Sequence, residues 1–432
     1  MKLLRILYYF LIPLLIIGIP FRFTSFPIAL FAIFPLLIFT SRHTVGIFLL
    51  VYGGPLGGVI RAMYPSLPVY GVILMFIGLL LIWDLVLEML GKYKPAIFSM
   101  LFVLAFFGLF YLTGPKDDFA NNKFINICLH GITMLFGYFA FDRSTKVDAE
   151  NLAKILFIAS ICMYTYVISD ISMSPGGLFD FNWFREQIKI DFARNGGVLS
   201  TVVGYQEIGM LVLFATVIFL SQVNISKWKY AFYVLCAAEL TLMSGCRQAI
   251  LGVLLAVVLR FALFRKENAE KGNVGSFLIW SVVAIFGVLF ATILLIPNIG
   301  SDIMASTLEG GDAGRQYLML QALQIFQDNP LFGVGIGGYH AITNMVYPHN
   351  FVMELLAETG LVGTIVSIVI LVIPLFRKGV GFYRITNSNM FYYLIVLGIF
   401  VRVMVSSDLT ESIELFSAVF AITVNKNLLH KF

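Results

Sequence analysis

Residues 95–113, PAIFSMLFVLAFFGLFYLT, decide the fold, because they contain no charged side chain and are long enough to cross a lipid bilayer as one helix. Similar apolar runs lie on both sides of this segment, near residues 6–20, 25–40, 44–60, 67–90, 124–141, 154–172, 198–221, 229–244, 249–264, 276–297, 351–376, 389–406 and 409–424. The pattern predicts an all-α, polytopic integral membrane protein. We expect about 12–14 transmembrane helices, and we expect them to form a single transmembrane domain over residues 1–432.

The composition excludes most soluble protein classes. Of the 432 residues, 59% are hydrophobic and 12% are charged, whereas soluble domains carry roughly 25% charged residues. The net charge of +5 is modest and indicates membrane orientation rather than affinity for nucleic acid. The four cysteines show no C-x-x-C spacing, so neither a disulfide framework nor a zinc site is predicted. The apolar N-terminus predicts a first span rather than a signal peptide, because a second apolar run follows it directly.

Charge distribution predicts the orientation of the spans. Most lysines and arginines fall on one side if both termini are cytoplasmic, as the positive-inside rule requires. Two loops on the opposite, outer side are long, at residues 173–197 and 298–350. Loops above about 12–15 residues are usually functional or disordered, and the aromatic and aliphatic side chains of these two argue against disorder. We therefore expect both loops to fold over the outer face.

A set of cationic and titratable side chains is predicted near this outer face, namely Arg194, Arg247, Arg315 and His349. An arginine costs about 2.5–3.5 kcal/mol at a helix centre on insertion scales, so several together indicate an anionic ligand such as phosphate. Arg315 is expected at the N-terminus of an amphipathic interfacial helix over residues 315–327, where free backbone amides also favour an anion. Taken singly, Arg194 and Arg247 are better explained by contact with lipid headgroups, and for Arg315 the two explanations are equal.

His349 lies just before the apolar run 351–376, and Asn350 is a candidate N-cap for a helix there. An imidazole with an ordinary pKa of about 6.5 can act as a general base at neutral pH. The alternative is an interfacial histidine with a structural hydrogen bond. Upstream, the block NPLFGVGIGGYH (329–340), which includes Gly335, predicts a tight re-entrant turn, because glycine lets two backbones approach closely.

Metal-binding patterns are weak. Asp117 and Asp118 form the only adjacent acidic pair, and Lys116 and Lys123 are placed in the same loop. We therefore expect neither a metal ion nor a cofactor. The acidic side chains expected inside spans are Asp84, Glu88, Glu207 and Glu239.

Residues 329–339 and the stretch PHNFVMELLAETGLVG (348–363) together resemble the signature of the O-antigen polymerase and O-antigen ligase family. His349-Asn350, followed by Gly360 and Gly363, fits the histidine motif at the end of that family's large periplasmic loop. SGCRQAILG (244–252) is similar to its serine–arginine helix start. GRQYLMLQAL (314–323) is similar to the arginine segment before its glycine block. The resemblance implies a GT-C-like glycosyltransferase of the bacterial inner membrane with a periplasmic active site.

The resemblance also implies roles and partners. The substrate would be an oligosaccharide linked to undecaprenyl diphosphate, and the reaction would need no metal. Arg247 and Arg315 would hold the diphosphate, with Arg194 as a third candidate that matches by position only. His349 would accept or orient the proton of the attacking hydroxyl, with Arg315 assisting catalysis. Asn350, Gly335 and Gly360 would support the site. Membrane lipids and a chain-length regulator protein are candidate partners, and nucleic acid is not.

Three activities remain open. A polymerase transfers the glycan to another carrier-linked repeat unit, and a ligase transfers it to lipid A–core. The Phe- and Ile-rich composition with small loops favours a polymerase, although the arginine–glycine spacings from Arg194 to Gly209 and from Arg315 to Gly333 do not match those of polymerases. A transporter or flippase of an anionic lipid-linked glycan is the alternative from a different class, because it too would need outer arginines.

Overall fold

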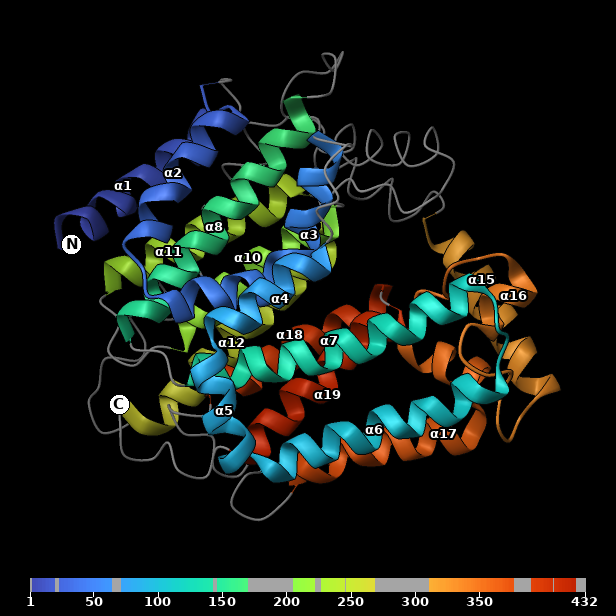
Figure 1. Cartoon of the computed structure of the whole chain (residues 1–432). Helices are drawn as coiled ribbons and strands as arrows, with labels where there is room; N and C mark the ends of the chain where they lie inside the picture. The colour runs from blue at the N-terminus through green and yellow to red at the C-terminus, as the bar shows by residue number, and fades with distance from the viewer. Residues whose placement is uncertain are drawn as a thin grey trace. The chain divides into compact units, whose positions relative to one another are not determined.

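The computed structural model describes residues 2–19, 23–63, 71–142, 146–169, 205–221, 227–244, 246–268, 311–376, 390–406 and 408–424. These residues form helices and short connections, with no strand among them, so the all-α prediction is confirmed over this part (Figure 1). Each predicted apolar run coincides with described helices except 276–297. That run and the loop 173–197 lie outside the described residues.

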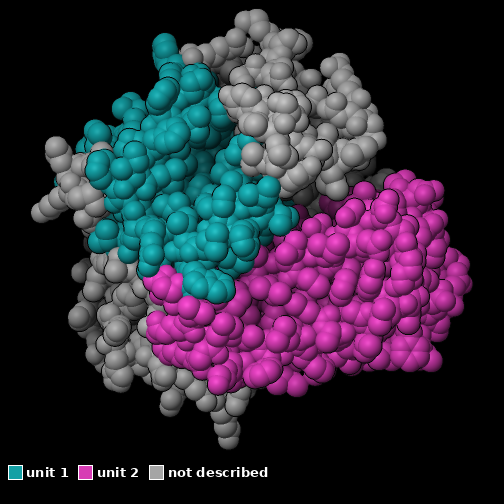
Figure 2. Space-filling view, in the orientation of Figure 1, with its two compact units in different colours: residues 1–83, 140–303 teal, residues 84–139, 304–432 magenta. Residues whose placement is uncertain are grey.

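The helices form two compact units, residues 1–83 with 140–303 and residues 84–139 with 304–432 (Figure 2). Unit 1 contains α1 (Lys2–Gly18), α2 (Phe26–Ile38), α3 (Arg42–Met63), α4 (Gly71–Leu81), α8 (Lys146–Ser169), α10 (Tyr205–Leu220), α11 (Lys227–Ser244) and α12 (Arg247–Asn268). Unit 2 contains most of α5 (Trp83–Lys92), α6 (Lys94–Thr113), most of α7 (Asp118–Asp142), α15 (Gly311–Asp328), α16 (Gly338–Thr343), α17 (Phe351–Phe376), α18 (Met390–Ser406) and α19 (Leu409–Val424).

Among the described residues, three helices are long and apolar enough to cross a membrane, namely Lys94–Thr113, Asp118–Phe141 and Phe351–Leu375, or four if the bent pair α4 and α5 is one span. Several shorter apolar helices accompany them. The run 67–90 was expected to be one helix, and the structure divides it at Ile82. The amide of Ile82 is shared between the carbonyls of Gly78 (3.3 Å) and Leu79 (3.2 Å), which tightens the turn there.

Unit 1 is built around α8 and α10. Over the part whose side chains are described, α10 and the portion of α8 after Lys154 are apolar on all sides and almost wholly buried, as expected for helices at the centre of a bundle. Helix α8 packs against α2 and α10, and α10 also packs against α11 and α12. The Cβ that residue 209 lacks would lie 2.6 Å from the Cβ of Cys246, so Gly209 lets α10 approach the start of α12 closely.

Unit 2 is built around α19, which packs against α6, α17 and α18. Its Phe416 ring meets Phe107 of α6 edge-on at 5.9 Å between centroids, and meets Phe351 of α17 at 6.3 Å. The opposite faces of α6 and α17 leave large apolar side chains such as Phe102 and Ile365 exposed. Extended apolar surface of this kind is typical of helices that face lipid.

Helices α15 and α16 lie together at one end of unit 2, where α6 ends and where α7 and α17 begin (Figure 1). The short connection 114–117 and the longer connection 329–350 therefore meet. The ring of Phe119 stacks on His340 with 3.9 Å between centroids. The charge pattern assigned the loop 298–350 to the outer side, so we call this the outer end of unit 2. The side of the membrane that it faces remains a prediction.

Candidate functional site

Asn350 caps α17, as the sequence predicted. Its Oδ1 accepts hydrogen bonds from the amides of Val352 (3.0 Å) and Met353 (3.1 Å), which otherwise have no partner within the helix. Its Nδ2 donates to the carbonyl of Met404 in α18 at 2.9 Å. One side chain therefore fixes both the first turn of α17 and the position of that turn against α18.

His349 is held in a backbone conformation that favours glycine. Its φ is +59°, whereas side chains with a Cβ rarely adopt positive φ and lose roughly 1–2 kcal/mol when they do. Its half-buried ring meets the ring of Tyr347 edge-on, with 4.4 Å between centroids. Strain of this kind persists only where neighbours enforce it, and it is common at functional sites.

Helix α17 is broken at Gly360, where φ is +64° and ψ is −165°. The break removes the usual helical partners of two carbonyls before it, on Ala357 and Glu358, and of two amides after it, on Leu361 and Val362. An unpaired backbone group at membrane depth is costly, and irregular backbone is tolerated there only where other protein groups satisfy it.

The glycine block supplies all four missing partners. The amides of Val334 and Gly335 donate to the carbonyls of Ala357 (3.0 Å) and Glu358 (2.8 Å). The carbonyls of Pro330 and Leu331 accept from the amides of Leu361 (2.8 Å) and Val362 (3.1 Å). The two halves of the sequence motif are thus one structural element, a tight turn docked into a broken helix.

Glycine is required where the turn meets the end of α6 and where it meets the broken helix. Gly335 has φ +83°, and a Cβ there would lie 2.2 Å from the Cα of Gly114. A Cβ on Gly360 would lie 2.5 Å from the carbonyl carbon of Leu331. Atoms cannot approach so closely, so Gly335 and Gly360 support the element by leaving space for backbone.

A buried ion cluster lies directly behind this element. Lys123 of α7 donates to Glu354 (2.5 Å) and to both oxygens of Glu358 (2.8 and 2.9 Å) on α17. The Lys123 side chain is 3% exposed and each carboxylate 0%.

This cluster was not predicted from the sequence, for two reasons. Lys123 was placed in the loop with Asp117, but α7 already begins at Asp118. Both glutamates were left out of the acids expected inside spans. Their i, i+4 spacing within the apolar run 351–376 was the available signal, because an ionisable pair on one face of such a helix indicates a partner.

The cluster lies near the outer end and not at the middle of the span. Lys123 is in the second turn of α7, and Glu354 and Glu358 are in the first and third turns of α17. At a rise of about 1.5 Å per residue, none lies deeper than roughly 12 Å along its helix.

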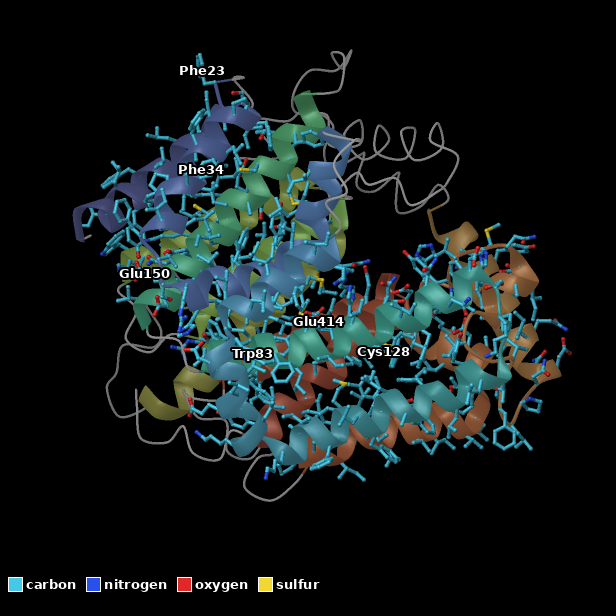
Figure 3. The ribbon with its side chains drawn as sticks, viewed as in Figure 1. Phe23, Phe34, Trp83, Cys128, Glu150 and Glu414 are labelled. Carbon is cyan, nitrogen blue, oxygen red and sulfur yellow. The ribbon has the colours of Figure 1, made fainter. Side chains whose placement is uncertain are left out.

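A second group of charges inside unit 2 was also missed. Arg402 of α18 pairs with Glu411 (2.6 Å) and Glu414 (3.7 Å) of α19, and Tyr138 donates to Glu414 at 3.1 Å (Figure 3, where Glu414 is labelled). These bonds join α7, α18 and α19.

Helix α15 is docked on the start of α17. Ala322 and Ile325 of α15 form one buried cluster with Tyr339 and Ala357. The Tyr339 hydroxyl donates to the carbonyl of Leu318 at 3.2 Å. Burial raises the pKa of Tyr339 to about 12, so its phenol is neutral at physiological pH. The expected amphipathic helix is therefore present, with one face packed on protein.

Of the predicted diphosphate ligands, Arg315 lies in the second turn of α15. It was expected at the helix N-terminus, but α15 begins at Gly311, where Asp312 and Ala313 are favourable in a first turn. Arg247 is the first residue of α12, as the serine–arginine motif implied. The side chains of both arginines, and the whole of Arg194, lie outside the described part. The structure places Asn350 beside His349 at the start of α17, and places Gly335 and Gly360 in the docked turn farther along that helix. The convergence of the three arginines on this site stays a prediction.

Comparison with known proteins gives one match. The family model described as O-antigen ligase matches residues 231–368, a segment that contains Arg247, Arg315, the glycine block and His349. The match confirms the resemblance to the O-antigen polymerase and ligase superfamily over this part of the chain. No curated protein and no solved structure matched the chain significantly.

Proposed function

From the O-antigen ligase domain at residues 231–368, we propose that this protein is an O-antigen polymerase. It would be a GT-C-like glycosyltransferase of the bacterial inner membrane, with one transmembrane domain, both termini in the cytoplasm and the loops 173–197 and 298–350 in the periplasm. It transfers a glycan from undecaprenyl diphosphate to a sugar hydroxyl of a lipid-linked repeat unit. The observation that carries the proposal is that the matched segment holds His349 in a strained conformation beside a capped helix start.

The proposed reaction is a displacement at the anomeric carbon. The acceptor hydroxyl oxygen forms a bond to that carbon, and the bond from the carbon to the diphosphate oxygen breaks. His349 takes the hydroxyl proton, so the attacking oxygen gains nucleophilicity as the new bond forms. Arg194, Arg247 and Arg315 balance the charge on the departing diphosphate, and their planar, two-pronged donors suit its oxygens. We expect activity to survive EDTA. Loss of activity that Mg²⁺ restores would contradict this.

The ion cluster of unit 2 favours a transferase over a transporter. Transporters place charged groups near the membrane midplane, where substrate and coupling ions bind. Lys123, Glu354 and Glu358 bond to one another near the outer end of their helices. A transporter would also have no need of a base at His349.

The test is replacement of His349 and Arg315 by alanine. We expect each variant to lose chain elongation by at least about 100-fold, because a general base or a charge-stabilising donor supplies that much. His43→Ala, in unit 1, serves as the control. Surface polysaccharide is resolved on a gel, and protein in the membrane is quantified in parallel. Polysaccharide of normal length in His349→Ala would contradict the proposal.

The matched family is that of the O-antigen ligases, which favours the ligase as a second candidate. The two activities differ in their acceptor, which is lipid A–core for the ligase. Deleting the gene separates them on a lipopolysaccharide gel. Core with a single repeat unit indicates a lost polymerase. Core without repeats, with free polymer accumulating, indicates a lost ligase.

A further inference from the structure

The short helix α16 starts at a residue that cannot cap it. Gly337 occupies the N-cap with φ +83°, and no side-chain bond caps the helix locally. A Cβ on Gly337 would lie 2.6 Å from the Cβ of Ala120, so the serine, threonine or aspartate that usually caps a helix cannot fit there.

Glu358 supplies this cap from another helix. Its Oε1 accepts the amide of Gly337 at 3.0 Å. A carboxylate at a helix N-terminus satisfies free amides and complements the helix dipole. Lys123 bonds to both oxygens of Glu358, so the carboxylate is fixed in orientation as well as in charge.

Residues 337–350, which we call the His349 strap, run between two such anchors. The first anchor is Gly337, held by Glu358. The second is Asn350, held by the first turn of α17 and by Met404. Between the anchors, Asn344 and His349 have φ values of +57° and +59°. Asparagine often adopts such a value at the end of a helix, as Asn344 does after α16, whereas His349 keeps its value only while its surroundings enforce it.

We propose that Glu358 is a positioning residue for His349, acting through the Gly337 end of the strap, and that Lys123 orients Glu358 for this task. The proposal rests on the transfer reaction above for its effect on rate. Glu358 touches neither substrate nor His349. Its loss removes the acceptor of the Gly337 amide, so the Gly337 end of the strap is held only by the contacts of Tyr339 and His340. The strap then becomes more mobile, and the imidazole samples positions from which it cannot reach the acceptor hydroxyl.

The test compares Glu358→Gln with Glu358→Met. Glutamine keeps an oxygen that accepts the Gly337 amide, and methionine keeps the length and volume without an acceptor. In both variants Lys123 retains Glu354 as its partner. Glu354→Met is the matched control, because it removes a carboxylate from the same helix and the same lysine, while the bond from Gly337 goes to Glu358.

Mobility of the strap is measured first, since it needs no substrate. A spin label is attached at Met345→Cys, a position that is 45% exposed, after Cys128→Ala removes the one half-buried cysteine; the other three cysteines are buried. We expect Glu358→Met to sharpen the label spectrum. Glu358→Gln and Glu354→Met should leave the spectrum as in the parent.

Rates are measured second. Glu358→Met should lower kcat by about 10- to 100-fold, the usual cost of a displaced catalytic group, while KM for the lipid-linked donor changes by less than about threefold. Glu358→Gln should stay near the parent. Glu358→Leu replaces Glu358→Met if the latter does not accumulate in the membrane.

Equal label mobility in Glu358→Met and the parent overturns the proposal, and so does equal behaviour of the glutamine and methionine variants. A higher KM at constant kcat overturns it too, because the strap would then serve binding. If the parent protein transfers no glycan, the proposed function fails, and the label spectra still decide whether Glu358 anchors the strap.

Discussion

Each compact unit contains an ion cluster built on a buried lysine, and these two lysine clusters have opposite charge balance. In unit 2, one lysine bonds to two carboxylates, namely Lys123 to Glu354 and Glu358. In unit 1, two lysines bond to one carboxylate, namely Lys154 (3.1 Å) and Lys229 (3.3 Å) to Glu150 (Figure 3, where Glu150 is labelled).

The unit 1 cluster joins helices through side chains. Tyr9 of α1 donates to Glu150 of α8, and Lys229 reaches Glu150 from α11. Lys154 also lies over the ring of Tyr9, 4.2 Å from its centroid. The Lys229 side chain is 30% exposed, so water screens its charge.

The two clusters differ in the groups that donate hydrogen bonds to Glu150 and to Glu358. The described bonds to Glu150 come from side chains, so that cluster fastens one helix to another. Glu358 also accepts a backbone amide of the His349 strap, so its cluster fastens a connection that carries the candidate base. Similar chemistry therefore serves packing in one unit and positioning in the other.

The largest contrast is expected from removal of one lysine in each cluster. Lys123→Ala leaves two buried carboxylates without their cation and should lower the free energy of unfolding by about 3–5 kcal/mol. Lys229→Ala leaves Glu150 with Lys154 and should cost only about 0–1 kcal/mol. Denaturant titration of the purified protein in detergent measures both. Equal losses would show that the two clusters are equivalent.

The next largest effect is expected at the break in α17. Gly360→Ala forces a Cβ against the Leu331 backbone at positive φ and should cost about 2–4 kcal/mol. Gly91→Ala in α5 is the control, because a Cβ there meets nothing within 4 Å. It should gain roughly 0.5–1 kcal/mol from helix propensity. If Gly360→Ala is as stable as the parent protein, the docked turn is not rigid.

The smallest effect is expected from the helix caps. Asn350→Ala removes two amide acceptors and the bond to Met404, and should cost about 1–2 kcal/mol. Ser25 occupies the N-cap of α2 in unit 1 without a side-chain bond, so Ser25→Ala should cost under about 0.5 kcal/mol. Thermal unfolding of the two variants side by side measures the difference. A larger loss for Ser25→Ala would reverse the ranking of the two units.

Local features of this chain were predictable and distant pairings were not. Apolar runs predicted the helices, and Asn350 was recognisable as a cap because its partners lie two and three residues away. Lys123 and Glu354 are 231 positions apart, and no local pattern joins them.

The break in α17 could not be predicted either, because it too depends on pairing between distant segments. Gly360 and the glycine block were both visible in the motif, but the sequence does not tell which carbonyl meets which amide. The start of α15 was predicted at Arg315 rather than at Gly311, although Asp312 and Ala313 favour a first turn before it.

The reciprocal hydrogen bonds between the glycine block and the broken α17 make these two segments of the chain depend on each other for their structure. Neither keeps its four backbone partners if the other moves away, so they should open as a single cooperative unit. In a deuterium-uptake experiment, the amides of Val334, Gly335, Leu361 and Val362 would exchange at one common rate, slower than the exposed tip of the strap around Met345.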